Sequence, residues 1–170
     1  MKKKLIGVRM FCMCTLMISM LLLAACGSSQ ESEGVTVDLK TLQEEMLAAD
    51  TTLPEMTKAT NEDSDAELSF SYLTDLEYSL ADSYFYAYAS DGTAPEIAVI
   101  KVKDSQDVVT MMDSLKEHIK SRKGTFQEYA PEQVELVEKA VLVHQGNYIA
   151  MIISEKSGLV QKAFQGAFEQ

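Results

Sequence analysis

The sequence predicts an α+β fold, with about four antiparallel strands in two hairpins and helices packed mainly on one face of the sheet. One tyrosine-rich segment alternates residue by residue, which is the period of a strand. Two pairs of apolar segments flank short loops that contain glycine, as hairpins do. The remaining apolar residues recur at helical spacing, and amphipathic helices need a sheet face to cover. Together these observations indicate one domain over residues 37–170.

The first predicted element is a helix over residues 38–49, with Asp38 as its N-cap and apolar residues such as Leu42 and Met46 at helical spacing. Pro54 stops any continuation of this helix. The segment around the proline is predicted as either a loop or a short edge strand, and the sequence leaves both open.

An acidic stretch follows this segment. Asp63, Asp65 and Glu67 alternate as in a calcium-binding loop, but the glycine and the distal glutamate of such a loop are missing at the required spacing. Acidic side chains at the positive end of a helix dipole explain the pattern more simply. We therefore predict no metal site here and a short helix that includes Leu68 and Tyr72.

The tyrosine-rich strand covers residues 82–90 and pairs through an Asp-Gly turn with an apolar strand over residues 96–103. Alternation places Tyr84, Tyr86 and Tyr88 on one face of the sheet. Two interpretations stay open for these three side chains. They form a binding surface that stacks against sugar rings or peptide side chains, or they cover the core beneath a neighbouring segment.

The second half of the chain continues with helices and a second hairpin. Its longest helix has apolar residues at spacings of four, three, four and seven. One later strand is apolar on both faces, so we expect it to be central in the sheet and covered. The predicted ranges are 104–129 for the long helix, 131–140 for a short helix, 140–144 and 148–154 for the hairpin strands, and 157–170 for the last helix.

Residues 1–25 have the features of a signal peptide, with three lysines near the start and then 16 uncharged, mostly apolar residues. That run is shorter than the roughly 20 residues that span a bilayer as a helix. It ends in Leu23, Ala24, Ala25 and Cys26, which resemble the lipobox that bacterial lipoprotein signal peptidase recognises. The resemblance implies cleavage before Cys26 and attachment of a diacylglycerol, with acyl chains such as palmitate, to its thiol. An uncleaved anchor and an ordinary signal peptide with a coincidental cysteine are the alternatives.

The lipid anchor predicts where the domain lies. Residues 26–36 continue from the cysteine as a small, polar, flexible tether, so the domain is expected at the outer face of the cell membrane. Two acyl chains hold a soluble domain on a membrane where one would not. Cys12 and Cys14 leave with the leader, and no cysteine follows Cys26. A disulfide framework and a cysteine-based zinc site are therefore excluded from the mature domain.

The charge of the chain argues against nucleic acid as a partner. Of the 15 lysines and arginines, four lie in residues 1–25, so 11 basic and 26 acidic side chains follow, a net charge of −15. Such a surface repels the phosphates of nucleic acid and anionic lipid headgroups. It suits solubility or a cationic partner.

Four motifs of the mature chain carry a family resemblance. They are DLKTLQEEMLAA (38–49), EIAVIKVKD (96–104), F-x-x-Y-x-P-E-Q-x-E-L-V (126–137) and A-V-L-V-x-x-G-N-Y (140–148). With the lipobox, they resemble the DUF4358 family, small lipoproteins of Firmicutes, largely clostridial. The likeness weakens over residues 51–88. Because the family has no assigned activity, the resemblance implies a location and a fold rather than a mechanism.

No catalytic constellation stands out in the sequence. His118 flanks the apolar stripe of the long helix and His144 ends a hairpin strand, so both are predicted as surface or boundary residues. We predict no enzyme activity, no metal and no cofactor. The leading hypothesis is a non-catalytic binding or accessory module of the cell envelope, with an unknown envelope protein or ligand as its partner. A carboxylate-dependent enzyme acting on envelope polymers and a small solute-capture lipoprotein are the alternatives.

Overall fold

A five-stranded antiparallel sheet lies at the centre of the protein in the computed structural model, which describes residues 36–169. The strand order is β1-β2-β3-β5-β4. Both predicted hairpins are present as β2–β3 and β4–β5, and the segment left open by the sequence is an edge strand that pairs with β2. The strands are β1 (Met56–Thr60), β2 (Ala81–Ala89), β3 (Glu96–Val102), β4 (Val141–Gln145) and β5 (Tyr148–Ile153).

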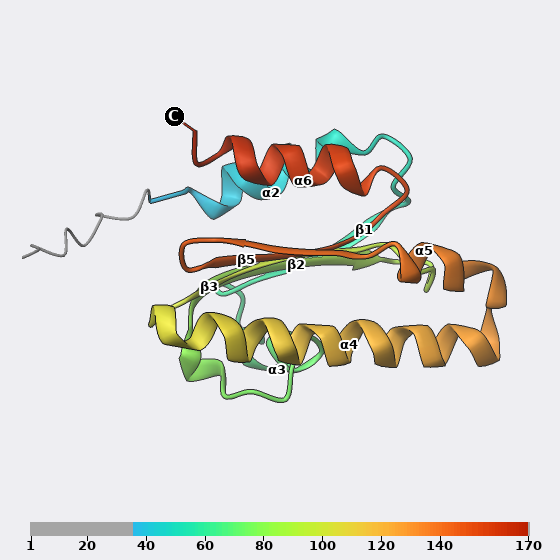
Figure 1. Ribbon diagram of the computed structural model, residues 1–170, viewed down its shortest axis with the longest axis horizontal. Coiled ribbons are helices and arrows are strands. Elements are labelled where there is room, and N and C mark those ends of the chain that lie inside the picture. Colours follow the sequence, from blue (N-terminus) through green and yellow to red (C-terminus); the bar gives the residue numbers. More distant parts are fainter. Residues whose placement is uncertain (1–35, 170) are drawn as a thin grey trace, which may run out of the picture. The chain divides into compact units, whose positions relative to one another are not determined.

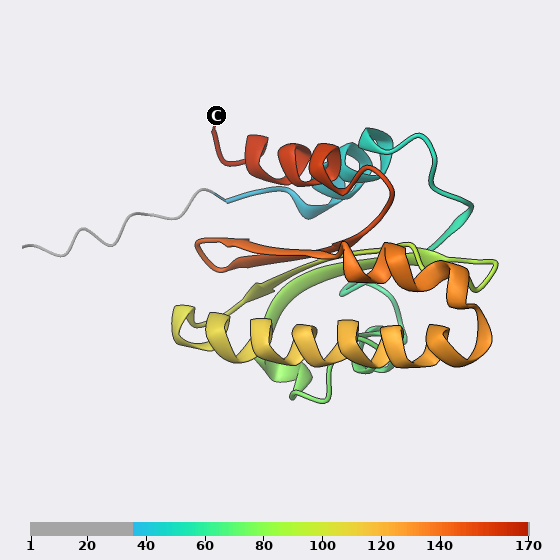
Figure 2. The ribbon, with the colours of Figure 1, turned by 45° about the vertical axis from the view of Figure 1, so that its right-hand side comes forward.

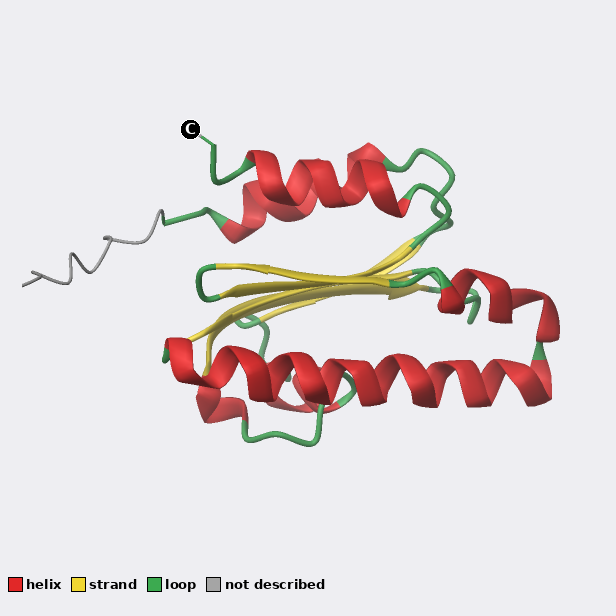
Figure 3. Cartoon of the chain, viewed as in Figure 1, coloured by secondary structure: helices red, strands yellow, loops and turns green. Residues whose placement is uncertain are grey.

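Helices cover both faces of this sheet. In Figure 1, α2 and α6 lie on one side of the strands, whereas α3 and α4 lie on the other, and the turned view of Figure 2 shows the same layers. Figure 3 shows the strands between the two helical layers. The helices are α2 (Leu39–Ala49), α3 (Ala66–Ser71), α4 (Val108–Tyr129), α5 (Val134–Glu138) and α6 (Ser157–Gly166), with short 3-10 turns η1 (Tyr78–Leu80), η2 (Ser105–Asp107) and η3 (Pro131–Gln133).

The predicted α+β class is confirmed, with five strands instead of about four and with helices on both faces instead of mainly one. The inner strands explain the second helical layer, because they are apolar on both sides. On β3, Ala98 and Ile100 pack on the side of α4, whereas Ile97 and Val99 pack on the side of α2 and α6. A sheet with two apolar faces needs a helical layer on each.

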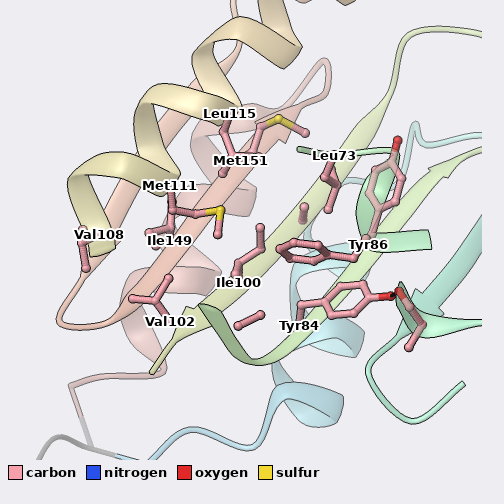
Figure 4. Close-up of a cluster of buried hydrophobic side chains, with 14 residues drawn as sticks. Leu73, Tyr84, Tyr86, Ile100, Val102, Val108, Met111, Leu115, Ile149 and Met151 are labelled. Carbon is pink, nitrogen blue, oxygen red and sulfur yellow. Dashed lines mark hydrogen bonds between the residues drawn. The ribbon is translucent and has the colours of Figure 1, made fainter. Parts of the chain in front are cut away.

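The core on the α4 side holds the site described below. Figure 4 shows Met111 and Leu115 of α4 above Ile149 and Met151 of β5, and all four side chains are fully buried. This packing fixes α4 along the sheet. It thereby fixes the second half of that helix against the end of the sheet where β3 begins.

Two aspartates cap helical segments, and the sequence predicts the first of these caps. The Asp38 carboxylate accepts a hydrogen bond from the backbone N–H of Lys40 at 3.0 Å and so caps α2. The Asp104 carboxylate accepts one from the backbone N–H of Gln106 at 2.9 Å. That bond caps η2, and the α-helix itself begins at Val108, a few residues later than predicted.

The predicted leader lies outside the described residues. This applies to the signal peptide over residues 1–25, to Cys26 and to the predicted tether up to residue 35. Over residues 36–169, no helix is both long and apolar enough to cross a membrane.

Candidate functional site

A buried carboxylate lies where β3 begins. Glu96 is the first residue of β3 and shares the α4-facing side of the strand with Ala98 and Ile100, and only 1% of its surface is exposed. An ionised carboxylate in such surroundings costs several kcal/mol unless it is paired, on the order of the penalty for any buried charge. The chain must therefore supply cationic partners for Glu96.

The partners come from α4. His118 and Arg122 are one helical turn apart, so they lie on the same side of the helix. His118 Nε2 is 2.7 Å from Glu96 Oε2, and Arg122 Nε contacts Glu96 Oε1. We call Glu96, His118 and Arg122 the charge cluster.

The three side chains of the charge cluster differ in their exposure to solvent. The side chain of Glu96 is 1% exposed, that of His118 is 11% exposed and that of Arg122 is 27% exposed. Because a carboxylate oxygen accepts hydrogen bonds, Nε2 of His118 is the donor in this contact. The arrangement holds two basic side chains against the buried carboxylate, and Arg122 is the more exposed of the two.

A phenol lies beside the carboxylate. Tyr86 of β2 is 5% exposed, and its ring centroid is 5.1 Å from that of Tyr88, which pairs directly opposite Glu96. Burial raises the pKa of the Tyr86 phenol strongly, and the negative charge of Glu96 raises it further. Tyr86 therefore remains a neutral phenol next to the Glu96 side chain.

A cavity of about 400 Å³ opens beside the charge cluster, and we call it the cluster pocket. Its size falls within the range of small-molecule sites, roughly 300–1,000 Å³. Tyr72, at the end of α3, lines it and is 54% exposed. The lining residues are Tyr72, Tyr86, Tyr88, Ala89, Ser90, Gly92, Thr93, Glu96, His118 and Arg122.

The turn between β2 and β3 forms the rim of the cluster pocket. Gly92 has a φ of +81°, a conformation that side chains other than glycine rarely adopt. The Asp91 carboxylate accepts hydrogen bonds from the Thr93 hydroxyl at 2.6 Å and from its backbone N–H at 3.0 Å. These bonds lower the pKa of Asp91 and hold the rim in one shape.

The structure separates the three tyrosines of the predicted ladder. They share one face as predicted, but Tyr84 is 1% exposed and donates a hydrogen bond to the carbonyl of Ala66 at 2.6 Å. Its ring lies within the core in Figure 4. Tyr84 is thus a core residue, and Tyr86 is also buried but forms part of the wall of the cluster pocket. Tyr88 is half-buried and lines the cluster pocket.

The two histidines have different surroundings. His144 is exposed, and its Nδ1 lies 3.3 Å from the carbonyl of Gly146 within the same hairpin. His118 is a boundary residue, as predicted: its side chain keeps 11% exposure, and its ring is paired with Glu96. Glu96 and Arg122 were not predicted as site residues. The signal for them is a carboxylate on a core-facing strand position together with a His-x-x-x-Arg spacing beside the apolar stripe of α4.

Another buried carboxylate serves the fold. Asp50 follows α2, is 2% exposed, and accepts hydrogen bonds from Thr52 N–H at 2.8 Å and from Lys156 N–H at 3.0 Å. Burial alone would raise the pKa of Asp50, but the hydrogen bonds from Thr52 and Lys156 lower it below its usual value. Asp50 therefore joins the end of α2 to the start of α6, and the hydrogen bonds to its carboxylate come from backbone groups and a hydroxyl rather than from basic side chains.

A second cavity, of about 440 Å³, lies beside the start of α2. Lys101 lines it, but the Lys101 ammonium is paired with Asp82 at 2.7 Å and lies 5.6 Å from the centre of the Tyr148 ring. None of the charged residues that line this cavity is buried. Over residues 36–169, no group of three or more His, Cys, Asp and Glu side chains could hold a metal ion. The cluster pocket is therefore the stronger candidate site.

Comparison with known families decides the relationship of the chain. The family model described as "Domain of unknown function (DUF4358)" matches residues 54–154, more than half of the sequence. The chain belongs to the DUF4358 family. Neither the curated proteins nor the solved structures gave a match. The DUF4358 match confirms the family resemblance and includes the three motifs between residues 96 and 148, whereas the motif at 38–49 and the lipobox lie outside it. The match contains all five strands and the complete charge cluster.

Proposed function

We propose that this protein is a lipid-anchored lipoprotein at the outer face of the cell membrane and that its DUF4358 domain is a non-catalytic binding module of the cell envelope. The cluster pocket is the observation that carries the proposal. A buried charged group, two basic side chains and an exposed tyrosine converge on one cavity of about 400 Å³. Such convergence of polar groups in a concave, partly aromatic site is typical of ligand binding.

The energetics of the charge cluster also support a binding role. Replacing buried ion pairs by apolar residues of similar volume is often neutral or stabilising by about 1–4 kcal/mol, so such pairs are weak evidence for a purely structural role. The apolar residues around Glu96 would tolerate an apolar side chain at this position. A binding site, in contrast, needs charged groups that are held in place before the ligand arrives.

The anchor half of the proposal rests on the lipobox-like residues before Cys26. Insertion of two acyl chains into the membrane contributes about 0.8 kcal/mol per buried methylene, which is enough to hold a soluble domain there. A flexible tether of the length predicted between the cysteine and the domain reaches roughly 15–20 Å. The domain is then placed close to the membrane surface, where envelope proteins and ligands are its partners.

Replacing the anchoring cysteine tests the location. Cys26→Ala is expected to abolish lipid attachment and cleavage before residue 26, because alanine has no thiol to receive the diacylglycerol. Cell fractionation and mass spectrometry of the N-terminus measure both effects. Cys14→Ala is the matched control, since that cysteine lies within the predicted signal peptide and its loss should change neither result. A Cys26→Ala protein that stays membrane-bound and is processed at the same place contradicts the anchor.

A photoreactive side chain at the pocket tests the binding role. A photoreactive phenylalanine in place of Tyr72, which is 54% exposed, is expected to crosslink to the bound partner on intact cells. The matched control is the same side chain in place of Tyr129, which is 81% exposed and does not line the pocket. Adducts isolated with the membrane fraction are compared by mass spectrometry. Identical adducts at both positions, or none at position 72, argue against a binding site at the cluster pocket.

One observation favours a second function, an enzyme that acts on envelope polymers. A buried carboxylate holds His118 through Nε2, and in many enzymes a carboxylate orients the histidine that acts as general base in the same way. Both oxygens of Glu96 are already in contact with basic groups, so this carboxylate would orient His118 rather than attack a substrate. Among the described residues, His118 has no hydrogen bond to a serine, threonine or other nucleophile. The binding role is therefore preferred. A small solute-capture lipoprotein remains the third proposal, since the pocket volume suits small solutes.

A further inference from the structure

The charge cluster is more basic than the surface around it. The domain as a whole is acidic, yet among residues 36–169 Glu96 is the only acidic residue that lines the cluster pocket, and it faces two basic side chains. Arg122 is always charged, and its contact with Glu96 uses only the Nε side of the guanidinium. The rest of the guanidinium is therefore a cationic group at the pocket, and an anionic group fits it best.

Arg122 has donors left for that group. Its guanidinium contacts Glu96 through Nε, and its terminal nitrogens make no hydrogen bond within residues 36–169. The terminal nitrogens of an arginine form a planar fork that matches the two oxygens of a carboxylate. The Arg122 guanidinium also lies over the ring of Phe126, 4.7 Å from its centre. Contacts on two sides therefore hold this fork in position at the pocket.

The walls of the pocket suit a flat, partly apolar body. Tyr72 and Tyr88 contribute phenol rings, and aromatic faces stack on other rings, including those of sugars. Hydroxyl groups of Ser90 and Thr93 line the rim and serve the polar edge of such a ring. The cavity of about 400 Å³ lies near the lower limit for small-molecule sites, so the ligand, or the part of it that enters, is small.

We infer that the cluster pocket binds a small organic carboxylate carried on a ring, with the carboxylate on Arg122 and the ring against Tyr72 and Tyr88. This inference rests on the proposed binding function and adds the chemical class of the ligand. Either a free small acid or the acidic residue of an envelope polymer presents this chemistry. Pairs of acidic and neutral probes of the same shape test whether the pocket prefers a carboxylate.

A matched pair of probes tests the class without any mutation. Benzoate and benzamide have nearly the same shape but differ in charge, and saturation-transfer NMR detects weak binding of each to the full chain in detergent micelles. Benzoate is expected to bind at least about tenfold more tightly than benzamide, as a charge-assisted hydrogen bond predicts. Glucuronate and glucose form a second pair that does not partition into micelles, and the same preference for the acid is expected.

Variants locate the bound probe. Arg122→Gln removes the fork and is expected to abolish the preference for the acid, and Arg122→Lys keeps the charge but weakens binding because lysine cannot bind both oxygens in one plane. Tyr72→Ala changes a half-exposed side chain and is expected to weaken both members of a pair without unfolding the domain. Lys120→Gln is the matched control on α4, because Lys120 is exposed and paired with Glu117. It should leave binding unchanged.

The outcomes separate the ligand class from the binding function. Equal binding of acid and amide that Tyr72→Ala weakens overturns the carboxylate class and leaves the pocket as a binding site. Benzoate binding that none of the pocket variants changes overturns the inference, because the probe then lies elsewhere. Binding of no probe also overturns the ligand class, and the crosslink at position 72 then decides the proposed binding function on its own.

Discussion

Replacing Glu96 with glutamine is expected to lower the free energy of unfolding by about 3 kcal/mol, the lower end of the range for breaking a buried ion pair. The change removes the negative charge that His118 and Arg122 share, and it leaves two basic groups against a neutral amide. The lower end applies because Arg122 keeps 27% of its side chain exposed and recovers part of its hydration. Urea unfolding followed by circular dichroism measures the loss.

Replacing the whole charge cluster gives the opposite expectation. For a protein with Glu96→Leu, His118→Leu and Arg122→Met, the free energy of unfolding is expected to lie within about 1 kcal/mol of the original value or to be higher. The reason is that no buried charge is then left without a partner. The same protein should lose the binding described above. Glu135→Gln is the control for charge removal in general, since the Lys139–Glu135 pair is exposed, and it should change stability little.

These two results together separate stability from function. If the single replacement at Glu96 costs less than about 1 kcal/mol, the three side chains do not depend on one another as the contacts indicate. If the triple replacement is as unstable as the single one, the cluster exists to hold α4 on the sheet. Recovery of stability with loss of binding supports the cluster as a site retained for its ligand.

Local patterns were sufficient to predict most elements of the fold. Both hairpins and the longer helices follow from the spacing of apolar residues, which is a property of neighbouring positions. The edge strand β1 could not be decided in this way. Among Met56–Thr60, only Ala59 is buried, so the strand has no apolar alternation and exists because β2 offers it a partner.

The second helical layer also depends on distant parts of the chain. Every residue of β5 is buried, which indicates a covered strand, but the pattern cannot say which helix returns to which face. Tertiary contacts determine the face that each helix covers, because α2 and α6 pack together and share one apolar cluster with β3 and β5. Sequence alone therefore predicted the class of the fold and missed one of its layers.

The candidate site is a long-range feature of the same kind. Glu96 and His118 are 22 positions apart and lie on different elements, so neither looks unusual in its own segment. An exposed histidine and an exposed glutamate are the common case for these residue types. The prediction becomes possible only when the strand face is taken into account, because Glu96 shares it with Ala98 and Ile100 and must be neutralised by the helix that covers them.

The tyrosines of β2 provide a second large and separable effect. Tyr84→Ala is expected to lower the free energy of unfolding by about 3–5 kcal/mol, the usual cost of removing a buried aromatic ring. Tyr84 is 1% exposed, and its ring makes edge contacts with Phe70 and Tyr78 at centroid distances of 5.4 and 6.1 Å. Tyr88→Ala is the matched control from the same strand face, and its half-buried side chain should cost only about 1 kcal/mol.

A conservative change at Tyr84 isolates its hydroxyl group and adds a dependence on pH. Tyr84→Phe leaves the Ala66 carbonyl without its donor and should cost about 1–3 kcal/mol.

Burial raises the pKa of Tyr84 to about 12, from 10.0 as a free phenol, so the unfolded chain loses this proton first. The stability from the protonated phenol is complete below about pH 10 and is lost as the pH rises toward the folded value. Tyr84→Phe should make that alkaline loss smaller, while the raised pKa of Tyr86 keeps it from vanishing. Equal losses for Tyr84→Ala and Tyr88→Ala, together with an unchanged alkaline profile in Tyr84→Phe, would mean that Tyr84 is not the buried anchor of this face.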